Sequence, residues 1–436
     1  GSETEADKLV ARPGASEHQL GLAMDLATRN SSTLSEKFGS TPEGQWVYAN
    51  CQRFGFIVRY LKGYEDVTGY SCEPWHIRYV GPEHAEAIAA FLQRAEALGG
   101  AERTHVVFTG AGTSAYVGDT CTPYLRHHGD NSKFRFSAIA TTDIVCAPLD
   151  YLRPEDPTVL VSFARSGNSP ESLAAVERAG QVVNNILFLN ITCAPEGKLA
   201  QQFKDDDQNL TILIPGANDQ GFAMTGSYSC MELMATMIFD TASHDEKATW
   251  VAQIAAMGRD VVKREPEIQK RVSSDFNRIT YLGSGSFAGE ARECQLKILE
   301  LTHGLIATSF DSSMGYRHGP KSFVDDKTLV FDLVHNDPYT RQYDLDILNE
   351  IAGDEIALHT VAIQQDGATK FEGESFTFGA EYAALPEAYL ALPYVMVAQT
   401  VSLLTSVKVG NTPDTPSPSG TVNRVVKGVT IHPFEA

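Results

Sequence analysis

Short apolar segments, each followed by a loop of small residues and then by a helical pattern, recur along this chain and strongly restrict its fold. The clearest example begins at Val159, continues through the stretch Ser162–Glu171, and reaches helical spacing at Leu173. Pro170 suits the first turn of that helix, because an N–H group at this position would have no hydrogen-bond partner within the helix. Strands that alternate with helices in this way predict a parallel, doubly wound α/β sheet.

The same pattern occurs twice. In the first copy we expect strands over residues 104–108, 134–140, 159–163, 186–191 and 210–214, followed by helical pattern over 227–271. In the second copy, a strand over 278–282 leads into Gly283–Phe287, which mirrors Gly110–Ser114, and residues 328–334 parallel residues 158–163. We therefore predict two similar α/β halves, residues 86–245 and 246–436, preceded by a small α+β segment of residues 1–85.

The loop after Val159–Val161 has the features of an anion site. Free backbone N–H groups and the positive end of the helix dipole meet there, and Ser166 and Ser169 add hydroxyl donors. In the alternative interpretation, the stretch is a polar turn that caps a helix. The second half has His335-Asn-Asp-Pro338 in place of this loop, so the sequence predicts one anion site, in the first half.

A helix is expected over residues 290–301, and Glu293, Lys297 and Glu300 are among its charged residues. Their spacing of i, i+4 and i+7 places them on one face. His318 follows in a loop. A solvated face with ordinary ion pairs is one interpretation. The other is proton-transfer chemistry on a sugar phosphate, which an acid, a lysine and a histidine near an anion site would suit.

Composition limits the partners and the compartment. The 436 residues are 43% hydrophobic and 21% charged, and the net charge of −20 argues against nucleic acid and anionic membranes. The seven cysteines are scattered and form no CxxC pair, which indicates free thiols. No apolar run of membrane-spanning length and no signal peptide is visible, so we expect a cytoplasmic protein.

Residues 1–85 carry two further motifs, Ser16–Asp25 and Glu73–Arg78. Two imidazoles and a carboxylate would leave a tetrahedral Zn²⁺ with one position open for water, and Glu73 could take the proton of that water. Together, these motifs resemble the zinc D-alanyl-D-alanine carboxypeptidases of the VanY type. The resemblance implies His18, Asp25 and His76 as zinc ligands and Glu73 as base. We expect this segment to be the C-terminal half of such a domain.

Residues from about 86 to 436 resemble a double sugar-isomerase (SIS) protein of the tagatose-6-phosphate ketose/aldose isomerase family. The stretches that carry the resemblance are Thr109–Ser114, Ser162–Glu171, Leu296–Glu300, Arg317–Lys321 and Asn423–Thr430. The resemblance implies a phosphate and substrate site formed by Thr113, Ser114, Arg165, Ser166, Asn168 and Ser169. It also implies Glu300 as the base between C1 and C2, Lys297 as its neighbour, His318 as the ring-opening residue and Lys427 as the lysine of the C-terminal tail.

The resemblance implies an aldose/ketose isomerase acting on a hexose or hexosamine 6-phosphate, without a metal or organic cofactor. An amino sugar such as galactosamine 6-phosphate would also lose ammonia and give tagatose 6-phosphate. In the relatives a neighbouring subunit supplies the histidine, so we expect a homodimer or a dimer of dimers with shared active sites. Two alternatives are a non-catalytic SIS protein that only binds a sugar phosphate, and a zinc D,D-carboxypeptidase working through residues 1–85.

Overall fold

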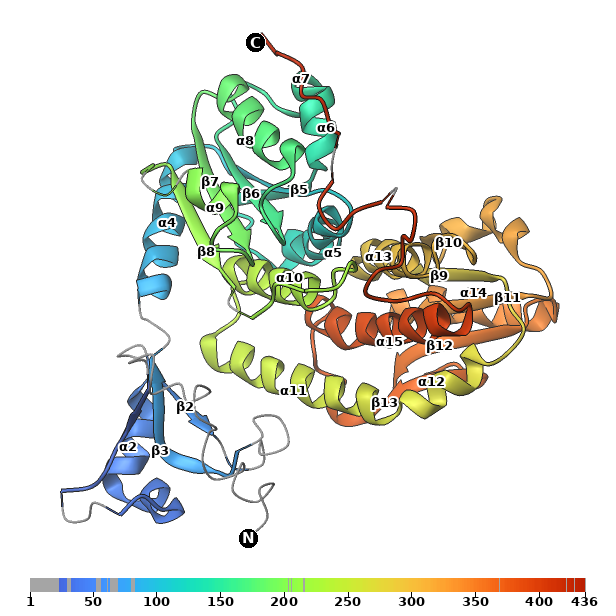
Figure 1. Ribbon diagram of the computed structural model, residues 1–436, viewed down its shortest axis with the longest axis horizontal. Coiled ribbons are helices and arrows are strands. Elements are labelled where there is room, and N and C mark those ends of the chain that lie inside the picture. The colour runs from blue at the N-terminus through green and yellow to red at the C-terminus, as the bar shows by residue number, and fades with distance from the viewer. Residues whose placement is uncertain are drawn as a thin grey trace. The chain divides into compact units, whose positions relative to one another are not determined.

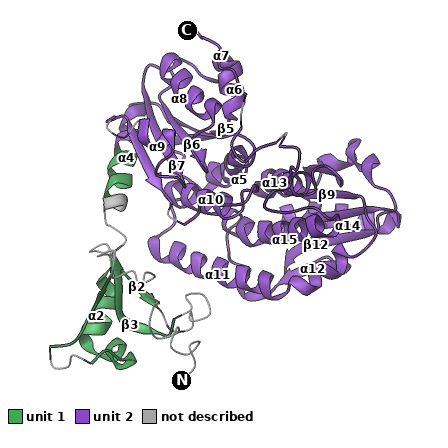
Figure 2. Cartoon of the chain, in the orientation of Figure 1, with its two compact units in different colours: residues 1–93 green, residues 94–436 purple. Residues whose placement is uncertain are grey.

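The chain divides into two compact units, residues 1–93 and 94–436 (Figure 2). The computed structural model describes residues 23–29, 33–51, 56–60, 62, 70–79, 83–202, 204, 206–214, 216–367, 369–420, 422–426 and 428–435. Helix α4 (Glu83–Gly99) contains the boundary between the two units.

The first unit contains a three-stranded antiparallel sheet in the order β1-β3-β2. Its described elements are β1 (Ala23–Asp25), η2 (Glu36–Ser40), α2 (Pro42–Asn50), β2 (Phe56–Tyr60) and β3 (Glu73–Tyr79). Strand pairing sets Asp25 opposite His76. The buried side chains of Cys51, Val58 and Ile77 pack together as a small apolar cluster in this unit. The sheet therefore brings two distant sequence motifs together.

The first half of the second unit is a five-stranded parallel sheet in the order β5-β4-β6-β7-β8. Its strands are β4 (Thr104–Thr109), β5 (Phe134–Ala138), β6 (Thr158–Ala164), β7 (Ile186–Thr192) and β8 (Asn209–Leu213). Every residue of β4, β6 and β7 is buried, as expected for strands covered by helices on both faces. The helices are α5 (Thr113–His128), α6 (Thr141–Cys146), α7 (Pro148–Tyr151), α8 (Pro170–Val182), α9 (Lys198–Gln202) and α10 (Gly226–Phe239).

The second half repeats this plan with a parallel sheet in the order β10-β9-β11-β12-β13 (Figure 1). Its strands are β9 (Arg278–Gly283), β10 (Ala307–Ser312), β11 (Thr328–Leu333), β12 (His359–Gln365) and β13 (Glu374–Phe378). The helices are α11 (His244–Lys263), α12 (Glu265–Val272), α13 (Ser286–Leu301), α14 (Thr340–Asp354) and α15 (Glu387–Lys408), with short 3₁₀ turns η4 (Gly315–Arg317), η5 (Pro320–Phe323) and η6 (Ala380–Tyr382). The predicted parallel-sheet architecture is confirmed.

Two equivalent helices, α5 and α13, hold the halves together. Each follows the first strand of its sheet and begins after a glycine with positive φ, 55° at Gly112 and 59° at Gly285. They pack closely at Gly289, where an added Cβ would lie 2.5 Å from the Asp119 backbone. Arg292 also pairs with Asp119 at 3.2 Å. This close packing lets a side chain of α13 reach the first half.

Helix α15 is long and strongly apolar. By length and composition it is the one described helix that could cross a membrane, but 67% of its most apolar window is buried inside the structure. It packs against α11, α12 and α13 as a core helix. Buried Tyr389 and Tyr394 on this helix find polar partners in Asp240 and the carbonyl of Val334. Its apolar character is therefore explained by core packing.

Candidate functional site

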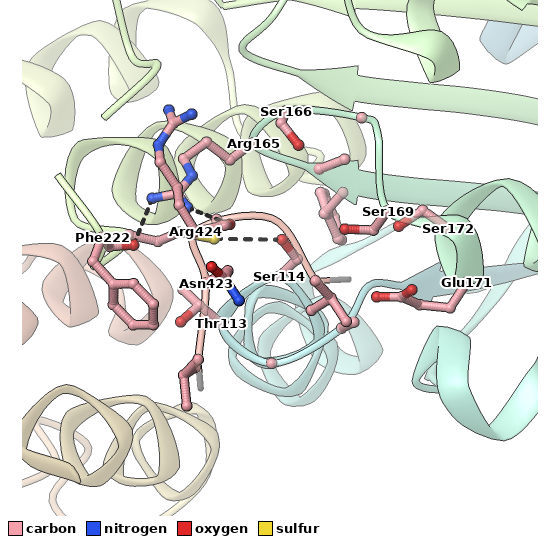
Figure 3. Close-up of a pocket in the computed structure, with 18 of the residues that line it drawn as sticks. Thr113, Ser114, Arg165, Ser166, Ser169, Glu171, Ser172, Phe222, Asn423 and Arg424 are labelled. Carbon is pink, nitrogen blue, oxygen red and sulfur yellow. Dashed lines mark hydrogen bonds between the residues drawn. The ribbon is translucent and has the colours of Figure 1, made fainter. Parts of the chain in front are cut away.

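A cavity of about 210 Å³ lies at the carboxyl ends of β4 and β6 (Figure 3). Strand β5 pairs with one edge of β4 and strand β6 pairs with the other, so the strand order reverses at β4. Ligands of doubly wound folds bind in the crevice at such a point. The N-termini of α5 and α8 both open onto this cavity.

Four of the predicted hydroxyl side chains line the cavity. They are Thr113 and Ser114 at the start of α5, and Ser166 and Ser169 in the loop before α8. Gly167, with a φ of 64°, lets this loop turn back to the helix. The loop and the two helix ends thus direct hydroxyl and amide donors to one place, as an anion site requires.

Asn168 belongs to the same loop but is not among the described residues that line the cavity. Its side-chain Oδ1 accepts a hydrogen bond from the Lys198 amide at 3.1 Å. In this structure, Asn168 therefore ties the loop to the start of α9.

Arg165 lines the cavity and is only 6% exposed. Its Nη1 donates to the carbonyls of Gly221 at 3.2 Å and Phe222 at 2.8 Å, and its Nη2 donates to the carbonyl of Arg424 at 2.9 Å. Burial, followed by the nearby charge of Arg424, lowers the pKa of Arg165 to about 10, so the guanidinium remains charged at neutral pH. Arg165 joins the loop, residues 221–222 and the C-terminal tail.

The second half contributes Glu300, which lines the cavity from the end of α13. Lys297, fully buried one turn earlier, donates from Nζ to Glu300 Oε2 at 2.5 Å and to Thr113 Oγ1 at 2.9 Å. Its Nζ also lies 3.4 Å from Glu293 Oε1. The predicted face of α13 is therefore buried against the first half.

Electrostatics keep this lysine charged. Burial opposes the charge on Lys297, but the carboxylates of Glu293 and Glu300 outweigh it and raise the pKa of the ammonium. Burial raises the pKa of Glu293 to about 8, although Lys297 counteracts part of this effect. At neutral pH, Lys297 is a cation that fixes the orientation of the Glu300 carboxylate.

His318 lies away from this cavity. It follows η4 on an exposed loop and is not among the described residues that line the cavity. Lys427 lies outside the described residues, but its neighbours Arg424 and Val426 line the cavity. The tail that carries Lys427 therefore reaches the site within the same chain.

Several lining residues were not predicted from the sequence. Glu171 and Ser172 lie in the first turn of α8, Phe222 and Met224 come from the loop before α10, and Asn423 and Arg424 come from the tail. Glu171 is 6% exposed, and its Oε2 has no hydrogen-bond partner. The position of Ser172 in the first turn of α8 was the signal that could have identified it.

The equivalent crevice of the second half has different chemistry. There the Asp337 carboxylate accepts the amides of Tyr339 at 3.0 Å and Thr340 at 2.9 Å. Its Oδ1 thus occupies the donors at the start of α14 that an anion would need. These two amides at the start of α14 are therefore not free to bind an anion.

In the first unit, Asp25, Glu73 and His76 lie together. His76 Nδ1 is 3.2 Å from Asp25 Oδ1 and 3.4 Å from Glu73 Oε2, and His76 is 4% exposed. His18, the remaining predicted zinc ligand, lies outside the described residues. A carboxylate and an imidazole on adjacent strands are donor types that zinc accepts.

The two units match different protein families. The SIS domain family matches residues 101–239. A D-galactosamine-6-phosphate deaminase, AgaS, from Escherichia coli is 43% identical over 344 residues, covering 77% of this chain and 87% of that protein. The crystal structure of tagatose-6-phosphate ketose/aldose isomerase from Escherichia coli has a TM-score of 0.72 and 35% identity, covering 93% of this chain and all of that one.

The first unit matches a different family. The D-alanyl-D-alanine carboxypeptidase family, VanY, matches residues 1–82. A D-alanyl-D-alanine carboxypeptidase from Enterococcus faecalis is 48% identical over 88 residues. That alignment covers 20% of this chain and 31% of the relative, so the chain spans about a third of the carboxypeptidase.

Proposed function

Because this chain belongs to the AgaS family of sugar-phosphate deaminases and isomerases, we propose that it isomerises and deaminates a hexosamine 6-phosphate. The reaction consumes galactosamine 6-phosphate and water and gives tagatose 6-phosphate and ammonia. The observation that carries the proposal is the meeting of Glu300 with the hydroxyl-rich loops in one cavity.

The phosphate is bound by the first half. Hydroxyls of Ser114, Ser166 and Ser169 and the amides at the starts of α5 and α8 surround its place, and the charge of Arg165 lies beside it. Binding energy from the phosphate then positions the reacting carbons at the other end of the cavity. Arg165 acts through its charge, since Nη1 and Nη2 already donate to backbone carbonyls.

Proton transfer falls to Glu300. After the ring opens, its carboxylate removes the proton from C2 and returns a proton to C1 through an enolamine. The resulting imine at C2 is hydrolysed by water, which breaks the C–N bond and releases ammonia. Lys297 holds the carboxylate in place at 2.5 Å. Lys427 of the tail is the further catalytic residue that we propose at this site.

Ring opening is assigned to His318 of a second subunit. The exposed position of this histidine, away from the cavity of its own chain, supports the assignment. Phe310 and Met314, on the same edge of the second sheet, are 40% and 49% exposed, as apolar residues covered by a partner would be. We therefore propose a homodimer or a dimer of dimers in the cytoplasm.

A turnover screen tests this function. Galactosamine, glucosamine, tagatose and galactose 6-phosphates are supplied in turn, and ammonia and ketose are followed separately. We expect ammonia and ketose in equal amounts from galactosamine 6-phosphate. Ketose from galactose 6-phosphate, or aldose from tagatose 6-phosphate, without ammonia would assign plain isomerisation instead. Binding without turnover of any of them would favour the non-catalytic alternative.

The first unit supports a second, independent candidate, zinc binding. The resemblance of the two motifs to the carboxypeptidases supports it, and Asp25, Glu73 and His76 of these motifs lie together. The described residues alone contain no group of three His, Cys, Asp or Glu side chains that could hold a metal, so the site needs His18 as well. Metal analysis of the purified chain would show one zinc per chain, lost in His76→Ala. Release of D-alanine from a pentapeptide would add peptidase activity, and zinc without release would limit the unit to metal binding.

A further inference from the structure

The C-terminal tail crosses from the second half to the first. After α15 the chain passes the cavity, where Val422 to Arg424 and Val426 form part of the wall, and ends beside α7 (Figure 1). Because the tail has no helix or strand over residues 422–426 and 428–435, its position depends on side-chain contacts.

A first anchor lies just before residue 427. Arg424 donates from Nη2 to Asn218 Oδ1 at 2.7 Å and from Nε to the carbonyl of Asp219 at 3.1 Å. Its own carbonyl accepts the bond from Arg165. These bonds fix the tail on one side of Lys427.

A second anchor lies after residue 427. Arg178, on α8 and only 4% exposed, donates from Nη2 to the carbonyl of His432 at 2.8 Å. Its guanidinium carbon lies 5.7 Å from the centre of the Phe434 ring, within the range of a cation–π contact. Phe434 also packs against the apolar cluster that includes Ala175 and Ala179 of α8. We call Arg178, His432 and Phe434 the latch.

The latch and the phosphate loop share one helix. Helix α8 begins at Pro170, directly after the loop, and carries Arg178 on its third turn. The eight residue-to-residue steps from Arg424 to His432 can span at most about 28 Å. Two anchors thus turn a free chain end into a short closed loop, which restricts the reach of the segment between them.

We propose that the latch holds the tail across the cavity and that Arg178 and Phe434 are positioning residues for Lys427. This role rests on the proposed function only in assigning catalysis to Lys427. The holding of the tail is a structural statement that can be measured without substrate.

Tryptic cleavage of the folded chain tests the holding of the tail. Trypsin cuts after Arg424 and Lys427, and intact mass shows loss of the C-terminal fragment. We expect release to be about tenfold faster in Arg178→Ala and in Phe434→Ala, because each removes one bond or contact of the second anchor. Val429→Ala, a change of a 40% exposed tail residue, is the matched control and should cleave like wild type. Equal release from all four proteins would overturn the latch.

Turnover tests the positioning role. We expect kcat to fall about tenfold in both latch variants with KM changed much less, since the phosphate contacts remain. Phe434→Leu, which keeps an apolar contact, should recover part of the loss. A large loss of stability would mimic this result, so the unfolding midpoint of each variant is measured, and a fall in kcat that follows the midpoint would argue against positioning.

The two readouts separate the proposals. Unaltered turnover in Lys427→Ala, together with faster tryptic release in the latch variants, would contradict a catalytic role for Lys427 and support the latch. Normal tryptic release in the latch variants, together with loss of turnover in Lys427→Ala, would support the proposed function and contradict the latch.

Discussion

The Nζ atom of Lys297 donates a hydrogen bond to Oγ1 of Thr113 at 2.9 Å, although the two residues are 184 positions apart and belong to different halves. Thr113 begins the helix that follows the first strand, and Lys297 lies near the end of the equivalent helix of the second half. This bond joins the proposed phosphate site to the helix that carries the proposed base, Glu300.

Replacing Glu300 by Gln should nearly abolish turnover. The amide keeps the size of the side chain but cannot take the proton from C2, so we expect kcat to fall by about 10²- to 10⁴-fold, with little change in KM. Steady-state kinetics on galactosamine 6-phosphate measures both constants. Near-full turnover in this variant would exclude Glu300 as the base.

Replacing Ser169 by Ala should weaken substrate binding. The change removes one hydroxyl donor to an anionic group, which predicts a KM about tenfold higher and a smaller effect on kcat. Ser132→Ala, at an exposed turn, serves as the control. If Ser169 lies outside the phosphate site, the two variants will have the same KM.

Mixing two inactive variants tests the shared site. A Glu300→Gln chain and a His318→Ala chain each lack one group, but a mixed dimer would contain one complete site. We expect up to about a quarter of wild-type activity after subunit exchange, because half of the dimers are mixed and each has one working site. Exchange shown by mass spectrometry without recovered activity would place His318 in its own chain's site.

Stability should fall as the pH rises through about 8, because Glu232 is fully buried. Burial raises its pKa from 4.5 to about 8 in the folded protein, so the folded state binds this proton more tightly than the unfolded state. This stabilisation is complete below the pKa of Glu232 in the unfolded state and is lost above its pKa in the folded state. Between pH 7 and pH 9 this group alone predicts a loss of roughly 1 kcal/mol.

Urea unfolding at the two pH values, followed by circular dichroism, measures that loss. Glu232→Gln should have a smaller pH dependence than wild type, because the amide does not titrate. Glu196→Gln, at an exposed position, should behave like wild type. An equal pH dependence in all three proteins would show that Glu232 does not contribute to it.

The sequence predicted the parts of the fold that depend on local pattern. Continuous apolar runs such as Val159–Val161 become buried parallel strands, and the helical spacing of Glu293, Lys297 and Glu300 becomes one buried face. These features follow from spacing, which a sequence shows directly.

Other features depend on contacts between distant segments. Strand β10 was not predicted, because its residues are polar or only partly buried, as at Thr308 and Asp311. The surroundings of Arg165 were also beyond the sequence, since its partners are backbone carbonyls of residues 221, 222 and 424. The resemblance implied Arg165 only as part of the phosphate site, which does not describe a buried side chain that joins three segments.

The capped end of α14 has a consequence for stoichiometry. Both halves have the crevice in which doubly wound folds bind ligands, but in the second the Asp337 carboxylate accepts the amides of Tyr339 and Thr340. We therefore expect this duplicated fold to have one working anion site. Isothermal titration with inorganic phosphate should saturate at one equivalent per chain. In that case the second half contributes Glu300 to the wall of a single site and forms no site of its own.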